Sequence, residues 1–137
     1  MANGVEGEMR MTLEEASVGP VIAVSDLEAA RAFYEGKLEL RGEETPGGRL
    51  LHAGGETVAY LLEVGDQAGT AGWPVASFRV ENVAASVEAL RERDVPFLGP
   101  NDLPFDLDAL GVADQGAIAV AWMRDPDGNV LTVFSLR

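Results

Sequence analysis

Few side chains in this sequence could carry out chemistry, and His52 is the only histidine among the 137 residues. The absence of cysteine excludes disulfides, thiolate nucleophiles and cysteine-ligated metal sites. One histidine also excludes a multi-histidine metal site within one chain, and any Ser/His/Asp triad would depend on it. His52 and the carboxylate of Glu63 are therefore the candidate catalytic groups. A lone histidine in an edge-like strand is more often exposed and without a catalytic role.

Acidic residues dominate the charge, with 23 Asp and Glu against 10 Lys and Arg, a formal net charge of −13. Such a field repels phosphate backbones and anionic lipids, so we expect no nucleic acid and no membrane partner. It favours cationic or neutral ligands, although a solubilising surface explains it equally well. Because the chain has no apolar run of about 18 residues and no signal-peptide core near its start, we expect a cytoplasmic protein.

The length and the 47% hydrophobic content predict one folded domain with a packed core. Residues 1–16 have no hydrophobic period and predict a flexible N-terminal extension, which leaves residues 17–137 for the domain. Inside it, the segment Val24-Ser-Asp-Leu27 is echoed 56 residues later by Val80-Glu-Asn-Val83. Both segments place an Asp or Asn cap between a strand-like run and a helical pattern.

Each half predicts a strand, a helix and three further strands, so the expected fold is α+β with two tandem βαβββ units in a curved mixed sheet. The units span about 17–64 and 74–137, joined by a glycine-rich linker over 65–73. The first helix should run from Asp26 to about Gly36. The second unit should continue with strands at 95–98, 117–124 and 130–136, and a long loop over 99–116 is a candidate flap.

The repeated unit, the Phe33-Tyr34 pair and the turn Arg124-Asp-Pro-Asp-Gly-Asn129 resemble the vicinal oxygen chelate superfamily of glyoxalases, extradiol dioxygenases and bleomycin resistance proteins. The resemblance covers nearly the whole chain from Gly19 and implies a homodimer. It is specific for the fold but not for the activity, since this scaffold serves lyases, dioxygenases and pure binding proteins.

In the catalytic members, four inward residues on the first, fourth, fifth and eighth strands hold a divalent metal. By this resemblance the corresponding positions are Gly19, Glu63, Val75 and Thr132. Glycine and valine cannot ligate a metal, and a threonine hydroxyl is a poor sole anchor. We therefore expect no metal site of the family type and no cofactor. A displaced site built from carboxylates and His52 is the alternative.

Strand alternation predicts which side chains line a cleft, because neighbours point to opposite faces. If Gly19 and Val75 face the cleft, then so do alternate residues of the same strands, while Ile22, Val24, Phe78 and Val80 pack against the helices. Trp122 could stack on a flat ligand, although a core role is the commoner one. The expected ligand-binding residues are Val21, Ala23, Leu61, Glu63, Val75, Ser77, Arg79, Trp122, Thr132 and Phe134.

Two main hypotheses follow. The first is a metal-free binding protein that sequesters a small aromatic or basic compound in a cleft between βαβββ units. The second is an enzyme of the same fold, a lyase, isomerase or dioxygenase, that uses a displaced metal or an acid–base group such as Glu63 or His52. A weaker third is a regulatory or protein-interaction module, whose strand edges would serve a protein partner.

Overall fold

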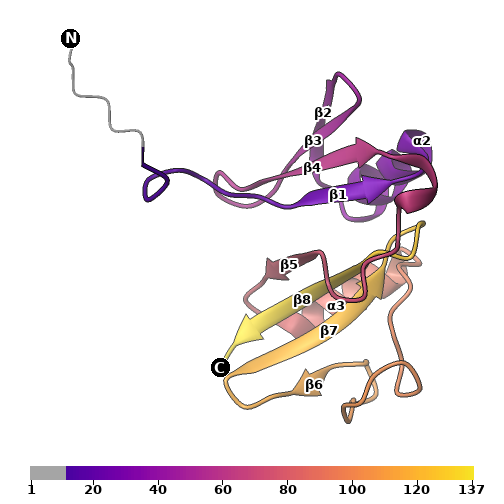
Figure 1. Cartoon of the computed structure of the whole chain (residues 1–137). Helices are drawn as coiled ribbons and strands as arrows, with labels where there is room; N and C mark the ends of the chain where they lie inside the picture. Colours follow the sequence, from indigo (N-terminus) through magenta and orange to yellow (C-terminus); the bar gives the residue numbers. More distant parts are fainter. Residues whose placement is uncertain (1–11) are drawn as a thin grey trace.

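The computed structural model describes residues 12–137 and contains two four-stranded sheets, one from each half of the chain (Figure 1). The predicted N-terminal extension lies mostly outside the described residues. The elements of the first unit are β1 (Val21–Val24), α2 (Leu27–Arg31), the π-helix η1 (Ala32–Lys37), β2 (Arg41–Thr45), β3 (Gly48–His52) and β4 (Val58–Glu63). After the 3-10 turn η2 (Gly65–Gln67), the second unit comprises β5 (Ala76–Arg79), α3 (Val83–Glu92), β6 (Ala113–Asp114), β7 (Ile118–Arg124) and β8 (Val130–Leu136).

The two sheets have the same topology, with strand orders β1-β4-β3-β2 and β5-β8-β7-β6. In each sheet the first strand pairs in parallel with the last one, and the other pairs are antiparallel. The parallel pairing requires the chain to return between strands, and a helix makes that crossover in each unit. This confirms the predicted fold of two βαβββ units. None of the helices within residues 12–137 is long and apolar enough to cross a membrane.

Both helices start at the caps that the repeat predicts. The Asp26 carboxylate accepts the N–H groups of Glu28 at 2.9 Å and Ala29 at 3.3 Å, and the Asn82 side chain accepts that of Ala85 at 3.0 Å. The caps satisfy N–H groups that the first helical turn leaves without partners. The first helix continues as a π-helix to Lys37, one residue beyond the predicted end at Gly36.

The strand predicted at residues 95–98 is wrong in extent, because only an isolated bridge between Phe97 and Met123 forms there. Pro96 has no N–H to donate and can only accept from Arg124 N, at 3.0 Å. The short strand β6, at the end of the long loop, pairs with the other half of β7. The outer edge of β7 is thus divided between two short segments.

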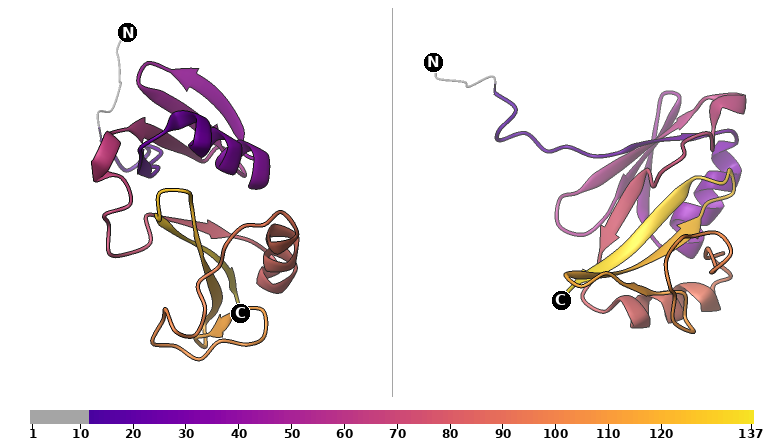
Figure 2. Two further views of the ribbon diagram at one scale, coloured as in Figure 1. Left: turned by 90° about the vertical axis from the view of Figure 1, so that its right-hand side faces the viewer. Right: turned by 60° about the horizontal axis from the view of Figure 1, so that its bottom comes forward.

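One hydrophobic core joins the two units. It contains Ile22, Phe33 and Leu61 from the first unit and Val87 and Val133 from the second, all less than 6% exposed. Both helices pack into this core, and each helix lies against the sheet of its own unit (Figure 2). The opposite face of each sheet therefore points away from the shared core.

A buried carboxylate, Asp125 in the β7–β8 turn, connects the units by hydrogen bonds. It accepts the hydroxyl of Tyr34 at 2.7 Å, the backbone N–H groups of Asp127 and Asn129, and the Asn129 side-chain amide. That amide also donates to the carbonyl of Ala23 in β1 at 2.9 Å. Burial, followed by the charge of Asp125, raises the pKa of Tyr34 far above its usual value, so the phenol remains a donor.

The variant Tyr34→Phe should lose about 1–3 kcal/mol of unfolding free energy, because it leaves a buried carboxylate with one donor fewer. Its deficit relative to the wild type should shrink above about pH 10, where the tyrosine ionises in the unfolded chain but not in the folded one. Urea denaturation at pH 7 and pH 11 measures both effects. Asp66→Asn, at an exposed site, is the control and should stay within about 0.5 kcal/mol. Equal stability of Tyr34→Phe and wild type would contradict this account.

Candidate functional site

The sheet face of the first unit that points away from the core is called the first open face. Residues that pair in the sheet share a face, so Val21 and Ala23 of β1 lie beside Tyr60 and Leu62 of β4. Val21 is 61% exposed and Leu62 38% exposed, whereas their neighbours Ile22 and Leu61 are buried in the core. Strand β3 adds Leu50 and His52 to this face, opposite Tyr60 and Val58.

The predicted facing is right for β1 and wrong for β4. Ile22 pairs with Leu61 and is buried with it, so Leu61 faces the shared core. Glu63 lies on the same side, where its Oε2 accepts the N–H of Leu27 at 3.3 Å, at the start of α2. The error is one residue of register, which flips every side chain of a strand to the other face. Tyr60 and Leu62, not named by the sequence analysis, occupy the open face instead.

On the second unit, most of the predicted residues come together on one face, called the second open face. Val75 does not, because it packs against the shared core. Ser77 pairs with Thr132 and Arg79 pairs with Phe134 across β5 and β8, while Trp122 pairs with Thr132 across β7 and β8. The hydroxyls of Ser77 and Thr132 hydrogen-bond to each other. The face therefore combines two hydroxyls, one guanidinium and two aromatic rings. Such a mixture can hold a small organic molecule in a fixed orientation.

The long loop over 99–116 covers part of the second open face. Leu103 and Leu107, like Phe134, pack against a small cluster that contains Trp122 and is separate from the shared core. The ring of Phe105 stacks on Trp122, with centroids 5.4 Å apart and an angle of 14° between the planes. Trp122 is consequently only 8% exposed, while Phe105 is 42% exposed. The sequence indicated a flap but contained no signal for this pair of rings.

The four positions that the resemblance assigns to the family's metal ligands are Gly19, Glu63, Val75 and Thr132. A Cβ on Gly19 would come within 2.1 Å of the Val58 carbonyl oxygen, so no larger residue fits there without a backbone shift. Val75 is apolar, and the hydroxyl of Thr132 is bonded to Ser77. Glu63 faces α2. Among residues 12–137, no three His, Cys, Asp or Glu side chains are grouped so that they could hold a metal ion. These residues do not fit a metal centre of the family type.

His52 lies on the first open face with its Nε2 3.4 Å from Oε1 of Glu43. This Nε2 is buried and forms no hydrogen bond within the described part of the chain. Nearby, the hydroxyl of Tyr60 accepts from Thr45 at 3.1 Å and donates to the Pro46 carbonyl at 3.0 Å. The imidazole and the carboxylate are close enough to pair when His52 is protonated.

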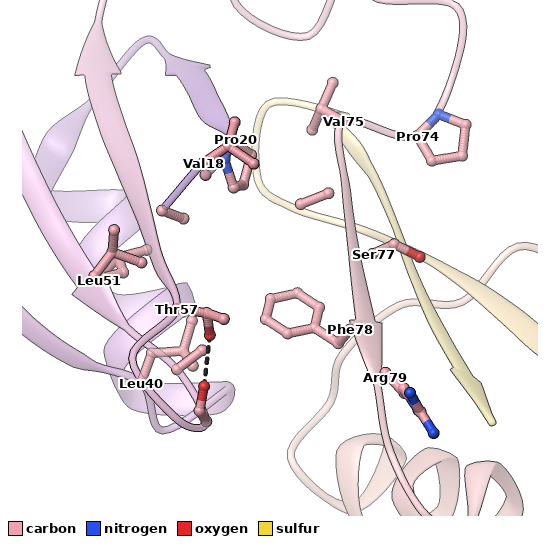
Figure 3. A pocket seen from close by; sticks show the side chains of 16 residues that line it. Val18, Pro20, Leu40, Leu51, Thr57, Pro74, Val75, Ser77, Phe78 and Arg79 are labelled. Atoms are coloured by element: carbon pink, nitrogen blue, oxygen red, sulfur yellow. Dashed lines mark hydrogen bonds between the residues drawn. The ribbon is translucent and has the colours of Figure 1, made fainter. Parts of the chain in front are cut away.

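A groove of about 830 Å³ runs between the two units and is lined by parts of both. Phe78 points into it, across from Leu40 and Leu51, whereas the side chains of Ser77 and Arg79 point to the other side of β5 (Figure 3). Gly19 and Val75 also border the groove. Most of its lining residues are apolar, and the hydroxyl of Thr57, which also lines it, is bonded to the Gly54 carbonyl at 2.7 Å. The groove offers volume but few polar groups that could orient a ligand.

A sequence profile of the glyoxalase/bleomycin resistance protein/dioxygenase superfamily matches residues 17–133. The chain belongs to this superfamily. A comparison with curated protein sequences found no match.

Solved structures of the superfamily share the fold. A glyoxalase/bleomycin resistance protein from Catenulispora acidiphila is 21% identical, with a TM-score of 0.63 over 88% of this chain and 98% of that one. The antibiotic-binding protein TnmS3 from Streptomyces sp. CB03234 is 23% identical, with a TM-score of 0.59 over 90% and 98% of the two chains. The fosfomycin resistance protein FosX from Listeria monocytogenes is 12% identical, with a TM-score of 0.65 over 90% and 94%. Similarity at this level establishes the fold alone.

The close approach at Gly19 gives a testable consequence. Gly19→Ala should destabilise the protein by about 1–3 kcal/mol, because its Cβ meets the Val58 carbonyl. Gly54→Ala is the matched control, since its Cβ would meet no atom within 4 Å, and it should change stability by about 0.5 kcal/mol or less. Thermal unfolding of both variants measures the effect. A Gly19→Ala protein as stable as Gly54→Ala would show that a larger residue is accommodated there.

Proposed function

We propose that this protein binds a small aromatic or basic compound without chemically changing it. The observation that supports this most is the second open face, where Arg79, Trp122 and the Ser77–Thr132 hydroxyl pair gather on one side of one sheet. Aromatic rings hold flat apolar ligands and hydroxyls orient them, while neither group is a catalyst by itself. The net charge of −13 attracts cationic compounds. The antibiotic-binding name of TnmS3, a protein of the same fold, is consistent with this class of ligand.

The absence of family-type metal chemistry is part of this proposal. Four observations argue against the metal ligands of the metalloenzymes. There is no room for a larger side chain at Gly19, and Val75 has no donor atom. The hydroxyl of Thr132 is bonded to Ser77, and Glu63 faces α2.

We further propose that the protein acts as a homodimer. Within one chain the two open faces point away from the shared core, so they cannot enclose one ligand between them. Val21 and Leu62 remain exposed on the first open face, which a second copy would cover. If the first open face of one protomer and the second open face of its partner formed a cleft, both of these faces would be buried.

A titration with 9-aminoacridine, a flat aromatic cation, tests the binding proposal. Trp122 fluorescence should be quenched in a Trp73→Phe background, which removes the exposed second tryptophan. The compound should be recovered unchanged. Trp122→Leu tests the second open face and should weaken binding about tenfold, by loss of a stacking contact of about 1–1.5 kcal/mol. Because this variant has no tryptophan in the Trp73→Phe background, its binding is followed by the fluorescence of the dye itself. No binding of this or other flat compounds, or turnover of a bound one, would contradict the proposal.

Sedimentation equilibrium tests the dimer. At micromolar concentration, the species should have twice the 14.5 kDa mass of the chain. Leu62→Lys should shift it toward the monomer, because it places a charge on an apolar face. Leu13→Lys, at an exposed leucine outside both sheets, is the control and should leave the mass unchanged. A wild-type species of a single chain's mass would contradict the dimer.

An enzyme is the second candidate, and the pairing of His52 with Glu43 favours it. A carboxylate 3.4 Å from an imidazole can hold the ring in a fixed orientation, as a general base requires. If any bound compound is turned over, His52→Ala should abolish the turnover while Glu63→Ala should preserve it, because Glu63 faces α2.

A further inference from the structure

Trp122 on the second open face is covered by a residue of its own chain. The Phe105 ring lies nearly parallel to the indole at a centroid distance of 5.4 Å, which is the offset-stacked arrangement that aromatic pairs prefer. Phe105 itself is 42% exposed, so the ring is held on one side only. A ring stacked on a tryptophan at a protein surface occupies the place that a flat ligand ring would take.

The segment that carries Phe105 is attached to the sheet by side chains and not by its backbone. Among residues 12–137, the backbone hydrogen bonds found in the loop belong to the turn at Gly99–Asp102 and to the part after Asp108. Residues 103–107 form none, and Pro104 has no N–H to contribute. They are held by the packing of Leu103, Phe105 and Leu107. Lifting this segment breaks apolar contacts only.

The two ends of the segment are fixed more firmly. On one side, Asp102 accepts the N–H of Gly99 at 2.8 Å. On the other, Asp108 accepts those of Leu110 and Val112 at 2.9 Å, and the Arg91 guanidinium donates to the Leu110 carbonyl at 2.8 Å. The loop thus has two anchored ends and a middle that can separate from the sheet.

We propose that residues 103–107 form a lid and that Phe105 occupies the aromatic subsite of Trp122 until a ligand replaces it. This inference rests on the proposed binding function and names its ligand class, a compound with a flat aromatic ring. The incoming ring takes over the stacking on Trp122, so the protein exchanges one aromatic contact for another. Phe105 therefore competes with the ligand for Trp122. A ligand ring binds only if its contacts are at least as favourable as the stacking of Phe105 that it replaces.

The experiment compares Phe105→Ala with two controls in the Trp73→Phe background, where Trp122 is the only tryptophan. Phe105→Ala should bind 9-aminoacridine about 2–10 times more tightly, which is the stacking energy of about 0.5–1.5 kcal/mol that the ligand no longer has to replace. Phe105→Tyr keeps a stacked ring and should bind as the parent does. Leu103→Ala loosens the lid without removing the ring and should give an intermediate gain.

Two readouts separate the failure of this inference from that of the proposed function. Acrylamide quenching of Trp122 in the ligand-free protein should rise in Phe105→Ala and not in Phe105→Tyr, whatever the protein binds. Weaker or unchanged dye binding in Phe105→Ala would overturn the competition, because Phe105 would then be a ligand contact or a bystander. Absence of dye binding in every variant would overturn the aromatic subsite. Dye binding in all variants with equal acrylamide quenching would leave the binding function standing and remove the lid.

Discussion

The arrangement of the two halves depends on one buried carboxylate and the core around it. The Asp125 carboxylate accepts hydrogen bonds from the hydroxyl of Tyr34, in η1, and from the side-chain amide of Asn129. The same amide also donates to the carbonyl of Ala23 in β1. These bonds hold the β7–β8 turn against the first unit, and the shared core contains residues of both units and both helices. Once the halves are joined in this way, the opposite faces must point outward. The outward placement of Ser77, Arg79 and Thr132 follows from this constraint, and it is the reason for the proposal that a second copy closes the cleft.

The same constraint separates the groove between the units from the residues that could recognise a ligand. The groove between the units has the volume of a binding site, but its lining comes from the helix-covered side of each sheet, with Phe78, Leu40 and Leu51 around it. The hydroxyl pair, the guanidinium of Arg79 and the stacked ring of Trp122 lie on the other side. Volume alone does not provide orientation, which requires polar groups in fixed positions. The second open face has those groups and is the stronger candidate.

The sequence predicts those features of the fold that depend on local chemistry. The caps Asp26 and Asn82, 56 residues apart, revealed the repeat, and alternation along β5 and β8 placed Ser77, Arg79, Thr132 and Phe134 on one face. Alternation along β4 does not predict which of its side chains face the core, because this depends on its register with β1. That register places Leu61, and not Tyr60, beside Ile22. The contacts between Tyr34 and Asp125 and between Phe105 and Trp122 join residues distant in sequence or in a loop without periodicity, so no local pattern indicates them.

The central claim is that each ligand site combines the first open face of one protomer with the second open face of its partner. The most direct test mixes two variants that each bind 9-aminoacridine weakly, Tyr60→Ala in the first open face and Trp122→Leu in the second, and leaves the exposed Leu62 of the dimer face unchanged. If the claim holds, a mixed dimer contains one site with both faces intact, and subunit exchange should restore binding at about a quarter of the sites. If each site lay within one chain, both variants would stay defective in every dimer, and an absence of restored binding in confirmed mixed dimers would contradict the account.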